Sequence, residues 1–299
     1  LGWPAWAMLP VAVMLALAAS QLALALVNWA ATLLVTAEPL PRMNYSHGIA
    51  SASRTLVVVP TMLGSVERVD ALVEALEVRF LANRDPHLHY GLLTDFHDAA
   101  QEHLPGDEAL LAAAAAKIAA LNAAYGPPAN GNAGDTFFLF HRPRRWNARE
   151  RVWMGHERKR GKLADLNALL RGKAQAGPGE AFSHIVGDTR TLSNVRYVIT
   201  LDADTQLPRD AAAQFVATMA HPLNRPRFGS RDDQLTVTEG YGILQPRVGV
   251  ALPGSNRSGY ARLCGGDAGL DPYTRAVSDV YQDVFGEGSF IGKGIYDVD

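Results

Sequence analysis

The first 37 residues contain no Asp, Glu, Lys or Arg, and this feature constrains the fold more than any other part of the sequence. Residues 11–35, VAVMLALAASQLALALVNWAATLLV, exceed the ~20 apolar residues that a helix needs to cross a bilayer. A signal peptide would have a basic start and a shorter apolar core. A helix of a soluble domain is rarely apolar on every face for so long. The sequence therefore predicts that residues 1–37 form a transmembrane helix, at about 11–35.

Basic residues follow this segment, beginning with Arg42 and Arg54, and none precedes it. Because positive charge favours the cytoplasmic side of a membrane, we expect the rest of the chain to lie in the cytoplasm. Residues 38–53 contain Pro and Ser without an apolar period, which is typical of a linker. A soluble domain is predicted for residues 54–299.

The composition excludes several classes of protein. The chain has 299 residues, enough for one large α/β domain or two small ones, and its formal charge of −2 argues against general nucleic-acid binding. A single cysteine, Cys264, excludes an internal disulfide and fits a reducing compartment. The first residue is Leu and the last nine are IGKGIYDVD, so we expect a fragment of a longer protein.

Apolar, β-rich runs alternate with helical runs after residue 54. Strands are predicted within 54–63, ending at Pro60, within 87–99, ending at Thr94–Asp95, and at 135–142. The predicted helices are 65–83, with Ser65 as a possible N-cap, and 109–126. This β-α-β-α-β order predicts an α/β domain with a mostly parallel, Rossmann-like sheet and right-handed crossovers.

Two aspartates follow a further apolar run in the stretch YVITLDADTQLPRDAA, residues 197–212. Tyr197–Leu201 is typical of a buried parallel strand, and Pro208 is expected to open a helix over 209–219. If the chain stays extended, Asp202 and Asp204 point the same way. Two close carboxylates repel and need a cation between them, and oxygen ligands favour Mg²⁺ or Mn²⁺. On this motif alone, a solvated turn is an equally good interpretation.

Polar side chains also follow the earlier strands, with Thr61 after the first and Asp95 after the second. The carboxyl ends of parallel strands share one edge, where open α/β sheets bind ligands. In the basic run 141–172, KRGKLADLNALL predicts a glycine turn and a helix start, from which Lys162 would reach a phosphate. A solvated basic face is the simpler alternative, and nucleic-acid binding is disfavoured by the few aromatic residues.

Taken in order, RTLVVVPTML, LLTDFHDA, ERKRGKLADLNALLRG, YVITLDADTQLPRDAA, YGILQPRVGV and FGEGSFIGKGIYDVD resemble membrane-bound, processive glycosyltransferases of the GT-A fold. More closely, they resemble the glycosyltransferase section of cyclic β-1,2-glucan synthases, over nearly all of residues 38–299. The resemblance implies a UDP-glucose donor, a divalent cation, inversion at the anomeric carbon and a β-1,2-glucan acceptor. It also implies a large protein of the bacterial inner membrane.

The resemblance also assigns roles on the donor side of the site. It implies that Asp202 and Asp204 hold the metal and the donor's ribose–diphosphate. It places Asp95 near the uracil or ribose and Thr61 near the nucleotide, and it turns Lys162 and Asn167 toward the donor.

On the acceptor side, the resemblance places Gly288 and Ser289 in a loop beside the acceptor sugar. The carboxylate that deprotonates the acceptor is expected beyond Asp299. Glu287 is a weaker candidate for this base, because we expect it to support the loop instead.

Three other interpretations are open. A haloacid-dehalogenase-like phosphatase also has Asp-x-Asp after a strand, but it needs Thr at the position of Gln206, and Thr205 comes one residue early. A membrane-anchored nucleotide-sugar-binding module without activity would share all the donor motifs. A different processive β-glycan synthase would share them too.

Overall fold

The computed structural model describes residues 5–34, 39–126, 134–173, 180–231, 234–246 and 292–299. Helix α1, Ala5–Leu34, belongs to one compact unit. The second unit is an α/β domain that comprises Pro41–Gln245 and Ile291–Asp299. Each unit is described by itself below.

Helix α1 has 30 residues and carries no charged side chain. At ~1.5 Å per residue it is about 45 Å long, more than the ~30 Å hydrocarbon core of a bilayer. Its described apolar side chains, such as Leu15 and Trp29, are 64% and 60% exposed. The structure thus has a helix where the sequence predicts a membrane-crossing segment, and the crossing itself stays a prediction.

By length and composition, helix α3, Asp107–Tyr125, also reaches the apolarity of a membrane span, with a mean hydropathy of 1.2. Its packing gives it another role. Ala114 and Ile118 are fully buried in the core of the domain. The side chain of Asn122 donates to the carbonyl of Phe137 and accepts from the amides of Thr136 and Phe137, at the start of strand β3 (Phe137–His141). We therefore assign α3 to a helical layer of the domain.

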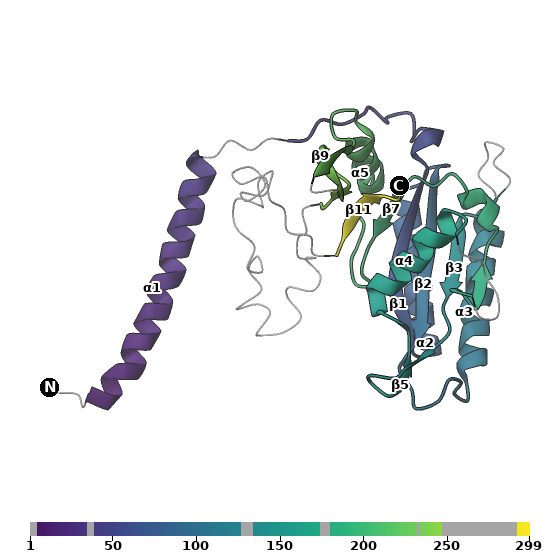
Figure 1. Cartoon of the computed structure of the whole chain (residues 1–299), viewed down its shortest axis with the longest axis horizontal. Helices are drawn as coiled ribbons and strands as arrows, with labels where there is room; N and C mark the ends of the chain where they lie inside the picture. The colour runs from purple at the N-terminus through teal and green to yellow at the C-terminus, as the bar shows by residue number, and fades with distance from the viewer. Residues whose placement is uncertain (1–4, 35–38, 127–133, 174–179, 232–233, 247–291) are drawn as a thin grey trace. The chain divides into compact units, whose positions relative to one another are not determined.

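A seven-stranded sheet forms the centre of the α/β domain, in the order β10-β11-β7-β1-β2-β3-β6 (Figure 1). Four central strands are parallel: β7 (Tyr197–Thr200), β1 (Thr55–Leu63), β2 (Leu88–Phe96) and β3 (Phe137–His141). The outer strands pair with their neighbours in antiparallel fashion: β11 (Gly294–Asp297) with β7, β10 (Ile243–Leu244) with β11, and β6 (His184–Val186) with β3. The prediction of a mostly parallel α/β sheet is confirmed.

The central strands are mostly apolar and are buried along nearly their whole length, because both faces of the sheet are covered. On one face, Val57 and Ile199 pack with α2 (Val66–Ala82), α3 and α5 (Ala211–Ala220). On the other face, Leu56 packs against α4 (Arg158–Leu170). The domain therefore has three layers, with the sheet in the middle.

Smaller elements complete the domain. The two hairpins pair β4 (Arg145–Asn147) with β5 (Val152–Met154), and β8 (Arg227–Arg231) with β9 (Gln234–Glu239). Short 3-10 helices cover Ser51–Ser53 and Thr189–Leu192.

Strands β1 and β2 run on to Leu63 and Phe96, past their predicted ends, and helix starts also differ from the predicted ones. Ser65 caps α2 as predicted, by accepting a hydrogen bond from the amide of Arg68. Helix α5, however, begins at Ala211 and not at 209, since Asp210 has a left-handed backbone with φ of 61°. Helix α4 begins at Arg158, so Gly161 lies inside its first turns rather than in a turn before it.

Gly161 serves close packing and not a change of chain direction. A Cβ at this position would lie 2.1 Å from the carbonyl oxygen of His156. The sequence predicts a turn at this glycine because no local pattern indicates the close approach of the His156 carbonyl.

Candidate functional site

The Asp202–Thr205 segment forms a turn directly after β7, with the amide of Thr205 donating to the carbonyl of Asp202 at 3.0 Å. The chain is thus not extended at the two aspartates, and the argument that alternation aims both carboxylates the same way does not apply. The strand that precedes them is buried and parallel to β1, as predicted, although it ends at Thr200. The turn stands at the carboxyl-terminal edge of the parallel strands.

Two lysines hold the carboxylate of Asp202. Nζ of Lys159 lies 2.6 Å from Oδ1 of Asp202, and Nζ of Lys293 lies 3.3 Å from Oδ2. Lys159 comes from α4 and also donates to the carbonyl of Gly292 at 2.7 Å. Partial burial raises the pKa of Asp202, but the hydrogen bonds and charges of both lysines outweigh this, so the pKa lies below its usual value. The carboxylate is therefore ionised and surrounded by cations.

Asp204 differs from Asp202 in being exposed. Its Oδ1 accepts a weak hydrogen bond from the hydroxyl of Thr205 at 3.4 Å. Carboxylate oxygens are suitable ligands for Mg²⁺ or Mn²⁺, and Mg²⁺ commonly takes one or two carboxylates and completes its shell with substrate phosphates. Within the described ranges, no cluster of three or more His, Cys, Asp or Glu surrounds a common point. The two carboxylates of Asp202 and Asp204 therefore fit a metal ion that binds together with a phosphorylated ligand better than they fit a permanent structural ion.

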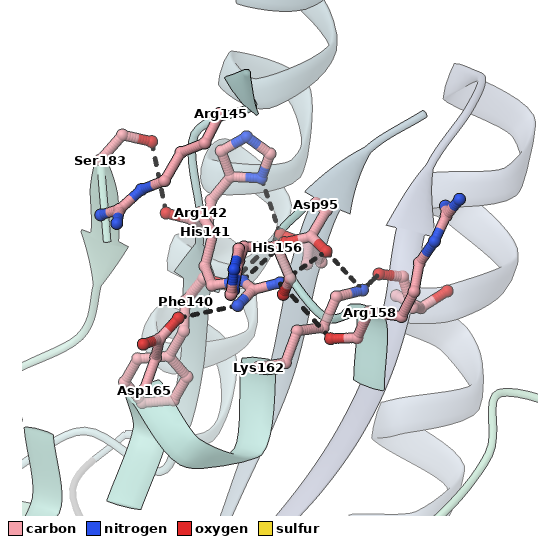
Figure 2. A network of polar contacts seen from close by, with 12 residues as sticks. Asp95, Phe140, His141, Arg142, Arg145, His156, Arg158, Lys162, Asp165 and Ser183 are labelled. Carbon is pink, nitrogen blue, oxygen red and sulfur yellow. Dashed lines mark hydrogen bonds and ion pairs between the residues drawn. The ribbon is translucent and has the colours of Figure 1, made fainter. Parts of the chain in front are cut away.

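Asp95, the other predicted carboxylate of this edge, is buried at the end of β2, with a side chain only 4% exposed. Figure 2 shows Arg142 and Lys162 converging on it. Arg142 binds it in a bidentate manner, with Nε 2.9 Å from Oδ1 and Nη2 3.1 Å from Oδ2. Nζ of Lys162 lies 3.2 Å from Oδ2. Both carboxylate oxygens are thus engaged inside the protein, and the predicted contact to a base or ribose remains untested.

Lys162 lies within the fold rather than at its surface, since its side chain is 5% exposed. It donates to the carbonyl of Thr61 as well as contacting Asp95. Burial lowers the pKa of Lys162, although Asp95 opposes this shift. In this structure Lys162 links α4 to the ends of β1 and β2, and the α4 lysine that reaches the Asp202 carboxylate is Lys159, three residues earlier.

Of the other residues that the sequence analysis names, Asn167 and Thr61 lie in the described part of the chain. Asn167 lies on α4, where its Oδ1 accepts a hydrogen bond from the hydroxyl of Tyr296 at 2.8 Å. Thr61 is buried in β1. Four residues lie outside the described residues: Cys264, Glu287, Gly288 and Ser289.

Sequence reasoning missed three cations of this edge, namely Arg142, Lys159 and Lys293. Arg142 directly follows β3, so its position after a strand was a usable signal. Lys159 lies in the basic run 141–172. A helix predicted to begin at Arg158 would have placed Lys159 in its first turn, at the sheet edge. Lys293 directly precedes β11, whose antiparallel place beside β7 no local pattern indicates.

A comparison with known proteins adds an independent finding. Over 297 residues, 99% of this chain, the sequence is 43% identical to the protein named cyclic beta-(1,2)-glucan synthase NdvB of Rhizobium meliloti (strain 1021). The matched segment makes up 10% of that protein, so the chain spans about a tenth of its relative's length. No family model matches the sequence. The family resemblance predicted from the motifs is confirmed over nearly the whole chain.

Proposed function

We propose a function from the premise that this chain corresponds to a segment of a cyclic β-(1,2)-glucan synthase. In this proposal the α/β domain has the GT-A fold and binds UDP-glucose together with Mg²⁺ or Mn²⁺. It acts as the donor-binding part of an inverting glycosyltransferase that extends a β-1,2-glucan. The activity, the donor and the acceptor of the whole relative come to this chain as parts of the proposal.

The observation that carries the proposal is the charge arrangement around Asp202. An ionised, half-exposed carboxylate lies at the ligand-binding edge of a parallel sheet, between the amines of Lys159 and Lys293. Two cations beside a metal-binding carboxylate match a ligand that carries several negative charges. A nucleoside diphosphate has this charge, and its release is the step that a glycosyl transfer must assist.

Each residue of the turn has a stated task in this proposal. Asp202 and Asp204 would hold the divalent ion, which when bound would offset the negative charge that grows on the departing diphosphate. Lys159 and Lys293 would exchange Asp202 for diphosphate oxygens as the donor enters. An acceptor hydroxyl must also lose a proton to a base on the opposite face of the sugar ring, a separate task from donor binding.

The proposal extends to location. Helix α1 would cross the bacterial inner membrane, since it is uncharged and about 45 Å long by its ~1.5 Å rise per residue. The α/β domain would lie on the cytoplasmic side, because basic residues follow the apolar segment.

The test is a calorimetric titration of the chain with UDP-glucose, with and without Mg²⁺, repeated with ADP-glucose. We expect Mg²⁺ to strengthen binding of UDP-glucose, and the double variant Asp202→Ala/Asp204→Ala to lose this enhancement. Asp210→Ala is the matched control, since Asp210 is a nearby exposed aspartate outside the turn. An unchanged metal enhancement in the double variant would remove Asp202 and Asp204 from the site.

Turnover requires a separate assay. Membranes that contain the protein are incubated with labelled UDP-glucose, and the linkage of the labelled product is determined. A β-1,2-linked glucan supports the proposal, and a product of another linkage would assign the chain to a different processive synthase.

A further inference from the structure

Helix α2 carries a buried arginine on the face that packs against the sheet. Val69, Leu72, Val73 and Leu76 form this face, and Arg79 continues it at helical spacing. Arg79 is only 3% exposed, although charged side chains are rarely this buried without a specific partner. Its position therefore calls for a physical explanation.

The guanidinium of Arg79 binds the backbone of the aspartate turn. Nη2 lies 2.9 Å from the carbonyl oxygen of Ala203 and 2.7 Å from that of Thr205. Nε also donates to the Thr205 carbonyl, at 3.1 Å. A fourth, longer contact of 3.5 Å joins Nη2 to the carbonyl oxygen of Asp202. A rigid fork from one helix thus holds carbonyls on both sides of Asp204.

The charge of Arg79 is compensated by backbone dipoles rather than by an ion pair. Burial lowers its pKa and the carboxylate of Asp204 opposes that shift, so the two groups feel each other's charge. Nη1 of Arg79 is buried and has no hydrogen-bond partner among the residues that the structure describes. The cation beneath the turn therefore lies within electrostatic reach of the Asp204 carboxylate, while its guanidinium holds the backbone on either side of that residue.

We propose that Arg79 is a positioning residue of the metal–donor site: it fixes the turn so that both carboxylates are held ready for a divalent cation. It touches neither metal nor donor and acts through the turn backbone. Bound groups need placement to within a fraction of an ångström, and a lost clamp leaves the turn free to take other conformations. The inference rests on the proposed function, since it assumes that the turn holds a metal.

The test measures the metal enhancement of UDP binding, which is the ratio of the UDP dissociation constants without and with Mg²⁺. We expect Arg79→Lys to reduce this ratio by about tenfold, and Arg79→Met by more, because misplacement of ~1 Å at a site has effects of up to about a hundredfold. UDP affinity without metal should stay within about twofold of the wild type, since Arg79 does not contact the donor.

Two further measurements separate positioning from general destabilisation. Val73→Ala is the matched control, because Val73 is buried on the same face of α2 but its apolar side chain donates no hydrogen bond to the turn. It should lower the melting temperature and leave the metal enhancement unchanged. Hydrogen exchange at the Thr205 amide, which donates to Asp202, should accelerate in the Arg79 variants and not in the control.

The outcomes are distinguishable. A wild-type chain without any metal enhancement would overturn the proposed function and this inference with it. A wild-type enhancement that survives in Arg79→Lys and Arg79→Met would overturn the inference alone. If Arg79→Met does not fold, Arg79→Lys and its exchange rate at Thr205 decide.

Discussion

Asp95 lies at the end of a parallel strand and Asp202 follows one, at the same edge of the sheet, and both lie within salt-bridge distance of a lysine of α4. They differ in their access to water. The side chain of Asp95 is 4% exposed, and that of Asp202 is 39% exposed. A carboxylate locked to Arg142 inside the protein stabilises the fold, whereas one held by two half-exposed lysines is able to exchange partners. The same local sequence pattern thus supports two roles, and burial separates them.

The largest expected effect is on stability, at Asp95. Asp95→Asn should lower the free energy of unfolding by about 3–5 kcal/mol, because buried Lys162 loses its counter-charge and buried Arg142 keeps only its ion pair with Asp165. Urea denaturation measures this loss. Asp98→Asn is the control: Asp98 pairs with Arg158 at 2.6 Å, but that arginine is 52% exposed, so the change should stay below about 1 kcal/mol. Equal losses for the two variants would contradict the distinction between buried and exposed pairs.

A smaller effect concerns pH, through two histidines of the buried interior, His89 and His141. Burial lowers the pKa of each to about 4. Since the unfolded chain takes up these protons near pH 6.5 and the folded chain does not, stability is full above that pH and falls as the pH drops toward 4. Each histidine should lower the free energy of unfolding by about 2 kcal/mol as the pH falls from 6.5 to 5.

Unfolding free energies measured across this range test the expected slope. His141→Gln should make the curve shallower, whereas His103→Gln should not, since the side chain of His103 is 84% exposed. A slope that persists unchanged in His141→Gln would assign the pH dependence to other groups.

The smallest expected change in stability is at Asp202. Asp202→Asn should alter the free energy of unfolding by less than about 1 kcal/mol, because exposed ion pairs contribute little. Chemical denaturation with and without Mg²⁺ and UDP checks this, and the stabilisation by the ligand pair should be lost in the variant. A loss as large as that of Asp95→Asn would erase the contrast between the two carboxylates.

The sequence predicts much of the sheet, because strands buried on both faces are rich in apolar residues without a helical period. It also predicts Ser65 as a cap, since capping is local. The errors occur where residues distant in sequence meet. No local pattern indicates that the Asp95 carboxylate is enclosed by Arg142 and Lys162, or that Lys293 precedes a strand that pairs with β7.

The clamp by Arg79 shows the same limit of local reasoning. An arginine at a core position of an amphipathic helix looks like a break in the pattern until its partners, the carbonyls of Ala203 and Thr205, are known. Those carbonyls lie more than a hundred residues away in the sequence, and only the folded chain brings them together.

The strand order of the sheet has a consequence for synthesis on the ribosome. Strand β1 lies between β2, which follows it directly in the chain, and β7, which emerges more than a hundred residues later. At about 5–20 residues per second, one edge of an apolar strand stays open for roughly ten seconds in a nascent chain. Open apolar edges invite pairing with other chains. Chaperone demand and aggregation during expression should therefore fall sharply once translation passes Thr200.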